Sequence, residues 1–316
     1  MGQDGLFGPI AADLERLEEM LVDSIHADGG ELAAAMLDLV SAGGKRIRPA
    51  LVLLCGGLGD YDFGRLAPAA IAVEITHAAT LVHDDVIDRA ELRRGRPTAA
   101  RRLGDEAAIV LGDHYFAKAY EFAARSGDAA VVAELARSVM AICAAELSQQ
   151  RDRYRYHVGE AAYFDRIRGK TASLLAASCW IGGHLGGLDL HAAALRSFGE
   201  NLGVAFQIAD DLLDYTADEA ELGKPVGHDL AEGHATLPLL RVLRERELPL
   251  HDGTPAEPAA VAATVAAVRE SPALEAAEAE AWRYAERARE DLRELPAGAA
   301  RDSLAGLAGY VVRRTR

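Results

Sequence analysis

The sequence predicts an all-α fold, and three observations support this class. Half of the 316 residues are hydrophobic, which is enough for a large core. Ala, Leu, Glu and Arg, all good helix formers, dominate the composition. No segment combines strict apolar and polar alternation with the Val, Ile and aromatic content of strands, so we predict no strand. No linker-like segment divides the chain, and we therefore expect a single domain over residues 1–316.

Apolar residues at helical spacing, interrupted by glycine and proline, indicate where the helices lie. The segment from Pro249 to Pro272, rich in Ala and Pro, is expected to be a surface loop with a short helix. The expected helices are Ala11 to Ile25, Gly30 to Ser41, Pro49 to Leu58, Arg65 to Asp88, Glu106 to Ala124, Ala129 to Gln150, a helix within Tyr163 to Ile181, Glu275 to Leu295 and Ser303 to Val312.

Charge and composition exclude several classes of function. A net charge of −15 argues against a general nucleic-acid-binding surface. The first twenty residues lack the basic and apolar regions of a signal peptide, and no run of about 18 uninterrupted apolar residues suggests a membrane span. Cys55, Cys143 and Cys179 are far apart in apolar stretches and are expected to be buried thiols. We expect a cytoplasmic protein.

The stretch from Leu81 to Thr98 gathers three aspartates, Asp84, Asp85 and Asp88, at the end of an apolar segment. In a helix, Asp84 and Asp88 lie about one turn apart on nearly the same face. Two carboxylates about 6 Å apart repel by roughly 3 kcal/mol at an effective dielectric of about 20, so a bound cation would be stabilising. Oxygen ligands on a rigid scaffold suit Mg²⁺, which keeps several waters and binds substrate phosphates.

The same Asp-Asp-x-x-Asp pattern recurs at Asp210, Asp211 and Asp214. One copy fits a solvated acidic helix face equally well. Two copies, each preceded by apolar residues, favour two acidic helix ends that bind metal.

Basic residues stand near these clusters in an otherwise acidic chain. Lys45, Arg46 and Arg48 follow two glycines that let the backbone approach a ligand, so they could converge on an anion. His77 precedes Asp84 by about two turns and could donate to a phosphate. A solvated basic loop is the alternative, but diphosphate binding explains the setting better.

Further cations and polar groups lie in two other segments. Arg93 and Arg94 belong to a turn after the first acidic cluster, where guanidinium groups suit phosphate. Lys170 and Thr171 enter an apolar helix and are expected to face a cavity. Lys224, in a Gly/Pro-rich loop after the second cluster, could reach an anion held there.

Together these motifs resemble the trans-polyprenyl diphosphate synthase family, and most closely its long-chain members of heptaprenyl and octaprenyl type. The resemblance runs from Gly43-Gly-Lys-Arg-Ile-Arg-Pro to Leu307-Ala-Gly-Tyr-Val-Val-Arg-Arg, with the motifs in the family's order. It implies an isoprenoid synthase fold whose helices surround a deep central cavity, with the two aspartate-rich helices facing each other across its mouth. It also implies a homodimer, three Mg²⁺ ions with bound diphosphate, and a transient membrane contact for product release.

The resemblance implies condensation of isopentenyl diphosphate with geranyl, farnesyl or geranylgeranyl diphosphate by ionisation, condensation and elimination. His228 and His234 depart from many relatives, which leaves one supplementary phosphate contact open. The family pattern assigns Asp84, Asp85, Asp88, Asp210, Asp211 and Asp214 to Mg²⁺ and the allylic diphosphate, with direct metal contact for Asp84, Asp88 and Asp210. It assigns Lys45, Arg48, His77 and Arg94 to isopentenyl diphosphate; Arg93, Lys170 and Lys224 to the allylic diphosphate; and Thr171 and Gln207 to the surroundings of the reacting carbons.

Product length follows from the size of three residues before the first cluster. By the family's logic, the growing chain passes Thr80 and Ala79, four and five positions before Asp84. Both are small, as is Thr76 a turn deeper, whereas aromatic rings there would close the cavity early. We therefore expect an all-trans product longer than C20.

Three alternatives remain at this point. A short-chain farnesyl or geranylgeranyl diphosphate synthase would share all of these motifs. A class I terpene cyclase should carry an Asn/Ser/Glu-type second metal motif and needs no Lys45 and Arg48 pocket. A non-catalytic subunit of a heteromeric synthase should have lost one acidic cluster, and this chain keeps both.

Overall fold

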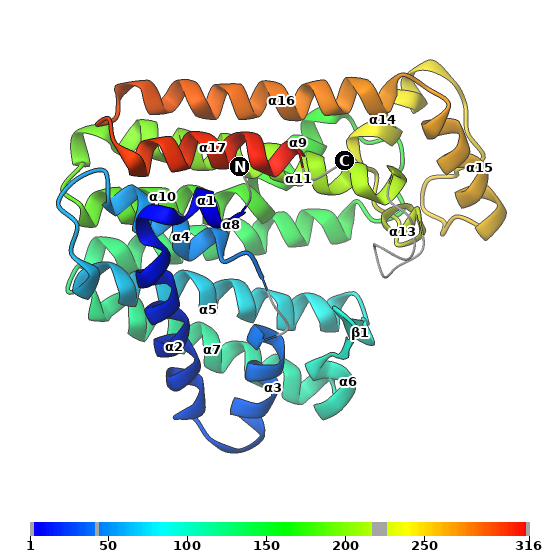
Figure 1. Cartoon of the computed structure of the whole chain (residues 1–316). Helices are drawn as coiled ribbons and strands as arrows, with labels where there is room; N and C mark the ends of the chain where they lie inside the picture. Colours follow the sequence, from blue (N-terminus) through cyan, green and yellow to red (C-terminus); the bar gives the residue numbers. More distant parts are fainter. Residues whose placement is uncertain (1–2, 42–43, 217–225, 314–316) are drawn as a thin grey trace. The chain divides into compact units, whose positions relative to one another are not determined.

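The computed structural model describes residues 3–41, 44–216 and 226–313, and within them nearly all regular structure is helical (Figure 1). The prediction of an all-α fold is confirmed. The chain groups into two compact units. Unit 1 comprises Met1–Val139, Ala177–Arg196 and Glu294–Leu304, and unit 2 comprises Met140–Ala176, Ser197–Arg293 and Ala305–Arg316. The expectation of one domain over residues 1–316 stays a prediction.

Unit 1 holds the N-terminal helices. Its elements are α1 (Gln3–Leu6), the 3-10 turn η1 (Gly8–Ile10), α2 (Ala11–His26), α3 (Gly30–Ser41), α4 (Ile47–Gly56), α5 (Phe63–Ile87), α6 (Ala99–Leu103), α7 (Asp105–Arg125) and the 3-10 turn η3 (Asp189–His191). Four helices begin in one unit and end in the other: α8 (Ala129–Arg151), α10 (Ser173–Leu185), α11 (Ala192–Thr216) and α17 (Ala299–Arg313).

The core of unit 1 is organised around α5. Nearly every side chain from Leu66 to Ala79 is buried, on all faces of the helix, so α5 must be surrounded by other elements. It contacts α2, α3, α4 and α7 (Figure 1). By length and composition α5 could also cross a membrane, but 72% of its most apolar window is buried within the structure, as in a core helix. Asp62 caps its start by accepting a hydrogen bond from the Gly64 N–H at 2.9 Å.

A short hairpin follows α5 and corrects the expectation of no strand. Strands β1 (Leu92–Arg93) and β2 (Arg96–Pro97) pair antiparallel. Arg94 and Gly95 form the two-residue loop, with φ of 51° and 76°. Positive φ at both loop positions is the type I′ geometry that matches the twist of a hairpin. Strands of two residues are too short to show any alternation in the sequence.

Unit 2 holds the C-terminal helices. α14, α15 and α16 pack against one another at its C-terminal part (Figure 1, yellow to orange). A π-helical turn joins α9 to α10, so the three segments form one helix with an irregular middle. The elements are α9 (Glu160–Ile167), η2 (Arg168–Ala172), α13 (His228–Ala231), α14 (Leu237–Glu245), α15 (Pro258–Arg269), α16 (Ala273–Asp291) and the 3-10 turn η4 (Leu292–Glu294), which ends at the border with unit 1.

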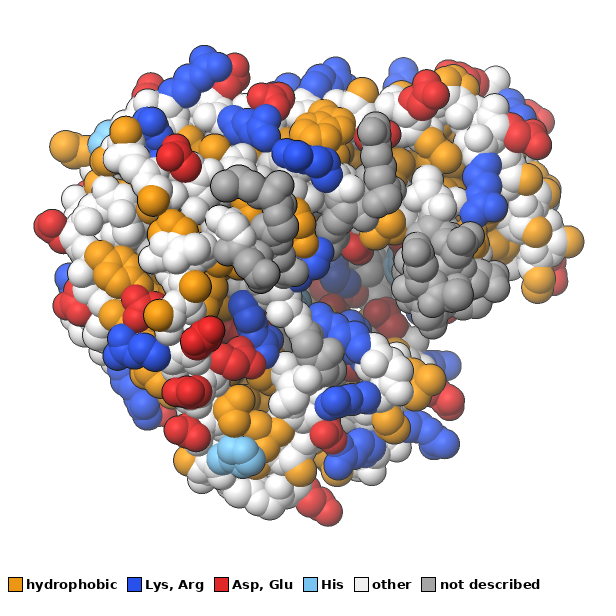
Figure 2. Space-filling model, viewed as in Figure 1, with side chains coloured by type: hydrophobic (Ala, Val, Ile, Leu, Met, Phe, Trp, Pro, Cys, Tyr) orange, Lys and Arg blue, Asp and Glu red, His pale blue; other side chains and the backbone are white. Residues whose placement is uncertain are grey.

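Two surface features bear on the expectations from composition. Acidic and basic side chains are interspersed over the face shown in Figure 2. Cys55 and Cys179 are buried, as expected, but Cys143 is exposed on α8, so the expectation of a buried thiol is wrong there.

Candidate active site

The first aspartate cluster lies at the end of α5, in unit 1. Asp84 is half-buried and Asp88 is exposed, and the Asp88 N–H donates to the Asp84 carbonyl at 2.8 Å, which closes the last turn. Asp85 is only 2% exposed, and its carboxylate accepts a hydrogen bond from Arg93 Nε at 2.7 Å. Burial raises the pKa of the Asp85 carboxyl, and the Arg93 guanidinium opposes that rise. The three aspartates therefore lie in two different environments: Asp84 and Asp88 are accessible to solvent, and Asp85 is buried beside Arg93.

The donor set at this helix end fits Mg²⁺. Asp84 and Asp88 supply carboxylate oxygens one turn apart, and Mg²⁺ takes one or two carboxylates while it keeps waters and binds phosphate oxygens. Within residues 3–41, 44–216 and 226–313, no three His, Cys, Asp or Glu side chains are placed to hold an ion by themselves. A metal at this position would therefore complete its coordination with water and a bound phosphate.

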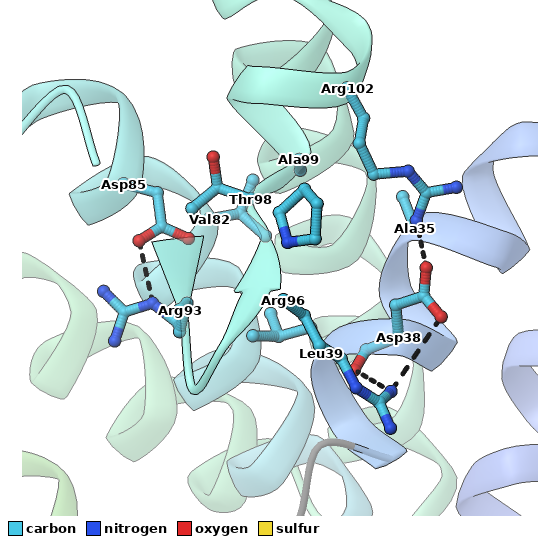
Figure 3. Close-up of a pocket in the computed structure, with 11 residues that line it drawn as sticks. Ala35, Asp38, Leu39, Val82, Asp85, Arg93, Arg96, Thr98, Ala99 and Arg102 are labelled. Atoms are coloured by element: carbon cyan, nitrogen blue, oxygen red, sulfur yellow. Dashed lines mark hydrogen bonds and ion pairs between the residues drawn. The ribbon is translucent and has the colours of Figure 1, made fainter. Parts of the chain in front are cut away.

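The hairpin after α5 fixes two arginines. Figure 3 shows the Arg93 guanidinium directed at Asp85, on one side of a hollow between α3, α5, the hairpin and α6. On the other side, Arg96 and Arg102 bind Asp38 of α3, which ties the hairpin to that helix. The positive φ of Arg94 is uncommon for a residue other than glycine, and it belongs to the tight loop of the hairpin.

A cluster of guanidinium groups surrounds His77. Burial lowers the pKa of His77 well below its usual value, and the charges of Arg48, Arg94, Arg93 and Arg46 lower it further. Burial also lowers the pKa of both Arg48 and Arg94. His77 is therefore neutral, with one N–H to donate. An anion at this cluster would offset the repulsion among its cations.

Arg46, in the same loop as Lys45 and Arg48, is directed elsewhere. Its Nε and Nη2 each donate to one carboxylate oxygen of Glu18 at 2.6 Å, and its Nη1 donates to Glu74 at 2.8 Å. Glu18 lies on α2 and Glu74 on α5, so Arg46 joins both helices to the start of α4. Lys45 is half-buried in this loop.

The second aspartate cluster lies near the end of α11, in unit 2. Asp210 is exposed, whereas Asp211 and Asp214 are buried. Asp214 Oδ2 accepts a hydrogen bond from the Asp229 N–H at 3.1 Å. Burial raises the pKa of Asp211 to about 7, and the charge of Asp229 contributes to this rise. As in the first cluster, the first aspartate is on the accessible side and the second is turned inward.

A chain of hydrogen bonds leads from Asp211 to the π-helical turn. Asp211 accepts from Tyr163 Oη at 2.7 Å and from Gln207 Nε2 at 2.8 Å, and Gln207 Oε1 accepts from Thr171 Oγ1 at 2.6 Å. Gly203, one turn before Gln207, lets α11 approach the π-helical turn closely, because a Cβ at this position would lie 2.5 Å from the Ala172 Cα. Irregular turns of this kind inside helices are frequent at functional sites. The network fixes the Gln207 amide and the Thr171 hydroxyl.

Other charged groups of unit 2 lie around Lys170. Its Nζ donates to Glu146 Oε2 at 2.6 Å. Although burial favours the neutral acid, the Lys170 charge and hydrogen bond lower the pKa of Glu146. Burial and the charges of Arg166 and Lys170 lower the pKa of His234 to about 4, with Asp229 acting in the opposite sense. His234 is therefore neutral near pH 7, and His228 begins α13.

The three residues expected to control product length lie on α5. Thr76 and Ala79 are fully buried, and Thr80 is half-buried and donates to the His77 carbonyl at 2.7 Å. The Thr76 hydroxyl oxygen is buried without a hydrogen-bond partner in the described parts of the chain. All three are small side chains on the core helix of unit 1.

Comparison with known proteins decides the family. A model of the polyprenyl synthetase family matches residues 30–267. The chain belongs to this family. The heptaprenyl diphosphate synthase component 2 of Geobacillus stearothermophilus is 39% identical over 313 residues, which are 98% of each protein.

Two solved structures are similar to this polyprenyl synthetase over nearly the whole chain. The decaprenyl diphosphate synthase of Rhodobacter capsulatus has a TM-score of 0.91 at 32% identity and covers 99% of both chains. The polyprenyl synthase of Caulobacter crescentus CB15, complexed with calcium and isoprenyl diphosphate, has a TM-score of 0.91 at 33% identity and covers 100% of this chain and 98% of that one. These similarities confirm the predicted family, the prenyltransferase class and the isoprenoid synthase fold.

The predicted site residues of this polyprenyl synthetase fall into two groups. Unit 1 brings Arg48, His77 and Arg94 together, and unit 2 brings Thr171, Gln207 and Asp211 together. Lys224 lies outside the described residues. The roles assigned to all of these side chains stay predictions.

Sequence reasoning missed the groups that hold the predicted residues in place. Glu18 and Glu74 bind Arg46, Tyr163 binds Asp211, and Glu146 binds Lys170. Each partner is at least 24 positions away in the sequence. No local pattern marks such pairs, although a glutamate within the apolar run before His77 is a signal that a buried cation lies nearby.

Proposed function

We propose that this polyprenyl synthetase condenses isopentenyl diphosphate with an allylic diphosphate to give an all-trans polyprenyl diphosphate longer than C20. The observation that carries the proposal is the cluster of Arg48 and Arg94 around neutral His77. Neither arginine forms an ion pair within the described part of the chain, and guanidinium groups suit a diphosphate. A terpene cyclase, which takes no second diphosphate substrate, has no use for such a cluster.

In this proposal, Arg48, Arg94 and Lys45 bind the diphosphate of isopentenyl diphosphate. His77 donates its single N–H to a phosphate oxygen. Arg48, Lys45 and His77 are half-buried, so water screens their charges less than it would on an open surface, whereas Arg94 is exposed. They hold the substrate by its diphosphate end and leave the double bond free to react.

The acidic helix ends serve the allylic diphosphate. Asp84 and Asp88 at the end of α5 would hold Mg²⁺ there, and Asp210 near the end of α11 would hold Mg²⁺ at its own helix. Bound Mg²⁺ stabilises the negative charge that develops on the departing diphosphate. The calcium and isoprenyl diphosphate bound to the Caulobacter relative support a hard divalent cation in this role. Arg93, Lys170 and Lys224 would add positive charge.

The reaction breaks the allylic C–O bond and forms a C–C bond between the allylic carbon and the double bond of isopentenyl diphosphate. A proton then leaves the new chain, and the released diphosphate accepts it. Thr171 donates its hydrogen to Gln207, so its oxygen lone pairs remain to stabilise positive charge on the allylic carbon. The small side chains of Thr76, Ala79 and Thr80 leave room for a long product, and the relatives named heptaprenyl and decaprenyl synthases support that length.

The test is incubation of the purified chain with Mg²⁺, radiolabelled isopentenyl diphosphate and one allylic primer at a time. Geranyl, farnesyl and geranylgeranyl diphosphate are the three primers, and chromatography of the products gives their length. We expect incorporation that stops when EDTA is added, with products longer than C20. Cyclic products without incorporation would support a terpene cyclase, and products that end at C15 or C20 would support a short-chain synthase.

We also propose that the chain forms a homodimer through α8. Four apolar residues of its second half, Met140, Cys143, Ala144 and Leu147, are exposed at spacings that place them on one helix face. Such a stripe is costly to expose to water and is typical of an interface. A different protein could occupy it instead, since the name of the Geobacillus relative describes one component of a synthase.

A further inference from the structure

Arg46 has an unusual backbone for an arginine that begins a helix. It precedes α4 with φ of 46°, in the left-handed region, and its side chain does not cap the helix. A residue other than glycine keeps such a conformation only where its surroundings fix it. The side chain supplies that constraint.

The Arg46 guanidinium is almost fully engaged. It makes the three bonds to Glu18 and Glu74 described above, and Nη2 also donates to the Val40 carbonyl at 2.8 Å. It therefore contacts α2, α3 and α5 at once. A diphosphate could recruit Arg46 only by displacing one of these partners.

Glu74 is the partner that matters for the cationic cluster. Its side chain is 9% exposed, and it lies about one turn before His77 on α5. Its charge favours the protonated forms of Arg48 and Arg94, so it is close enough to act on both. A buried carboxylate requires a paired cation, and here that cation is Arg46.

Arg48 is the cation that Glu74 would otherwise bind. The Arg48 Nε is buried and has no hydrogen-bond partner in the residues that the structure describes. Arg46 and Arg94 also lie next to each other at Gly44, where an added Cβ would be 3.5 Å from Arg46 Nη1 and 3.6 Å from Arg94 Nη1. Arg46 thus lies at the edge of the cluster, between the carboxylates and the cations available for a ligand.

We propose that Arg46 is a positioning residue for isopentenyl diphosphate, which acts by holding Glu74 away from Arg48 and Arg94. This inference rests on the proposed function of that cluster. With Arg46 in place, Glu74 is neutralised and the other two arginines keep their charges for the diphosphate. Without it, Glu74 pairs with Arg48, and the substrate has to displace a carboxylate.

The test compares Arg46→Gln, Glu74→Gln and the double variant by steady-state kinetics of the full chain. We expect Arg46→Gln to raise the KM for isopentenyl diphosphate by about tenfold or more, with kcat and the allylic KM within about twofold. Adding Glu74→Gln should bring that KM back to within about threefold of the wild type, because the competing carboxylate is gone. Glu74→Gln alone should not raise it.

A merely structural role would give a different pattern. The proposal would be overturned if the double variant had as high a KM for isopentenyl diphosphate as Arg46→Gln. It would also be overturned if Arg46→Gln raised the KM for both substrates together. If Arg46→Gln does not fold, Arg46→Lys replaces it, because it keeps the charge beside Glu74 and loses only the forked geometry. The KM for isopentenyl diphosphate should then stay within about threefold, and a tenfold rise would count against the proposal.

A binding experiment separates this inference from the proposed function. Calorimetric titration with inorganic diphosphate, without divalent cations, measures binding to cationic side chains without any contribution from metal held by the aspartates. We expect weaker binding to Arg46→Gln and recovery in the double variant. If the variants show this pattern of diphosphate binding but the wild type does not incorporate isopentenyl diphosphate, the proposed function fails and the role of Arg46 stands. Equal binding by all variants would overturn the role of Arg46.

Discussion

The six aspartates of the two motifs are not equivalent residues. In each motif the second aspartate is turned into the protein: Asp85 binds Arg93, and Asp211 binds Tyr163 and Gln207. Asp84 and Asp210, one position earlier, lie on the accessible side of their helices. The motif therefore combines carboxylates placed to meet a metal with carboxylates that fix the neighbouring side chains.

We predict that Asp84→Ala and Asp210→Ala each lower kcat by about a thousandfold or more, because each removes a metal ligand that stabilises charge on the leaving diphosphate. Steady-state kinetics with saturating Mg²⁺ measures the loss, and circular dichroism checks the fold. Asp113→Ala, which removes an exposed carboxylate on α7, is the matched control and should retain wild-type turnover. Near-normal turnover in either motif variant would contradict the metal assignment.

Ala79 tests the argument on product length at the scale of one side chain. It is fully buried on α5, so Ala79→Phe puts a ring where the structure has none, at a cost in stability of about 1–3 kcal/mol. We expect a shorter product distribution, measured by chromatography of radiolabelled products. Ala161→Phe, at an exposed position of α9, should leave the distribution unchanged. An unchanged distribution in Ala79→Phe would mean that the growing chain does not pass this residue.

At the scale of elements, helical periodicity predicts the bounds of most helices well. The expected helix from Ala11 to Ile25 is α2 (Ala11–His26), and the one from Ala129 to Gln150 is α8 (Ala129–Arg151). Periodicity works here because it reflects which local face is buried.

Two functional elements escape a periodic pattern. The π-helical turn that carries Lys170 and Thr171 adds a residue to a helix without changing its composition. The sequence predicts a turn at Arg93 and Arg94 but not the two short strands that pair beside it, because Arg94 stands where a type I′ hairpin loop usually has Asn or Gly. The sequence predicts candidate site residues but not the ion pairs of Arg46. Its partners Glu18 and Glu74 each lie 28 positions away, too far for a local pattern to mark them.

His184 joins three elements of unit 1 and gives the fold a pH dependence. Its Nδ1 bonds Asp189 of η3 at 2.6 Å, and its Nε2 bonds Asp128, next to the start of α8, at 2.9 Å. Neutral imidazole has only one N–H, so both bonds require the charged ring. Although burial opposes the charge, the two carboxylates raise the pKa of His184.

Because the folded pKa of His184 is raised, its stabilisation is fully present below about pH 6.5 and is lost as the pH rises through the folded value. We predict that deprotonation of His184 lowers the free energy of unfolding by about 1 kcal/mol or less as the pH rises, since water partly screens the site. Urea denaturation from pH 6 to pH 9 measures it. His184→Gln should remove this loss, whereas His251→Gln, at an exposed loop position, should keep it. The same slope in His184→Gln would contradict the assignment.

At the scale of the whole molecule, the charge distribution explains why the cationic cluster is so local. The chain carries a net charge of −15, so its overall field repels anionic substrates. At physiological salt such repulsion fades beyond about 8 Å, and a ligand near the cluster is affected chiefly by the groups it touches. Arg48, Arg94 and His77 can therefore bind a diphosphate although the molecule as a whole is acidic.

Association of whole molecules is tested at the apolar stripe of α8. Leu147 is 74% exposed, and in a homodimer the partner would cover it. Leu147→Glu would place a charge in that interface without a partner, which usually costs enough to dissociate a dimer. We predict that light scattering after size-exclusion chromatography finds a dimer for the wild type and a monomer for Leu147→Glu. Leu190→Glu is the matched control, because Leu190 is fully exposed in η3, outside the stripe, and this variant should remain dimeric. If the wild type is instead monomeric and inactive alone, and becomes active only with a second protein, the stripe belongs to a heteromeric synthase and the homodimer proposal is wrong.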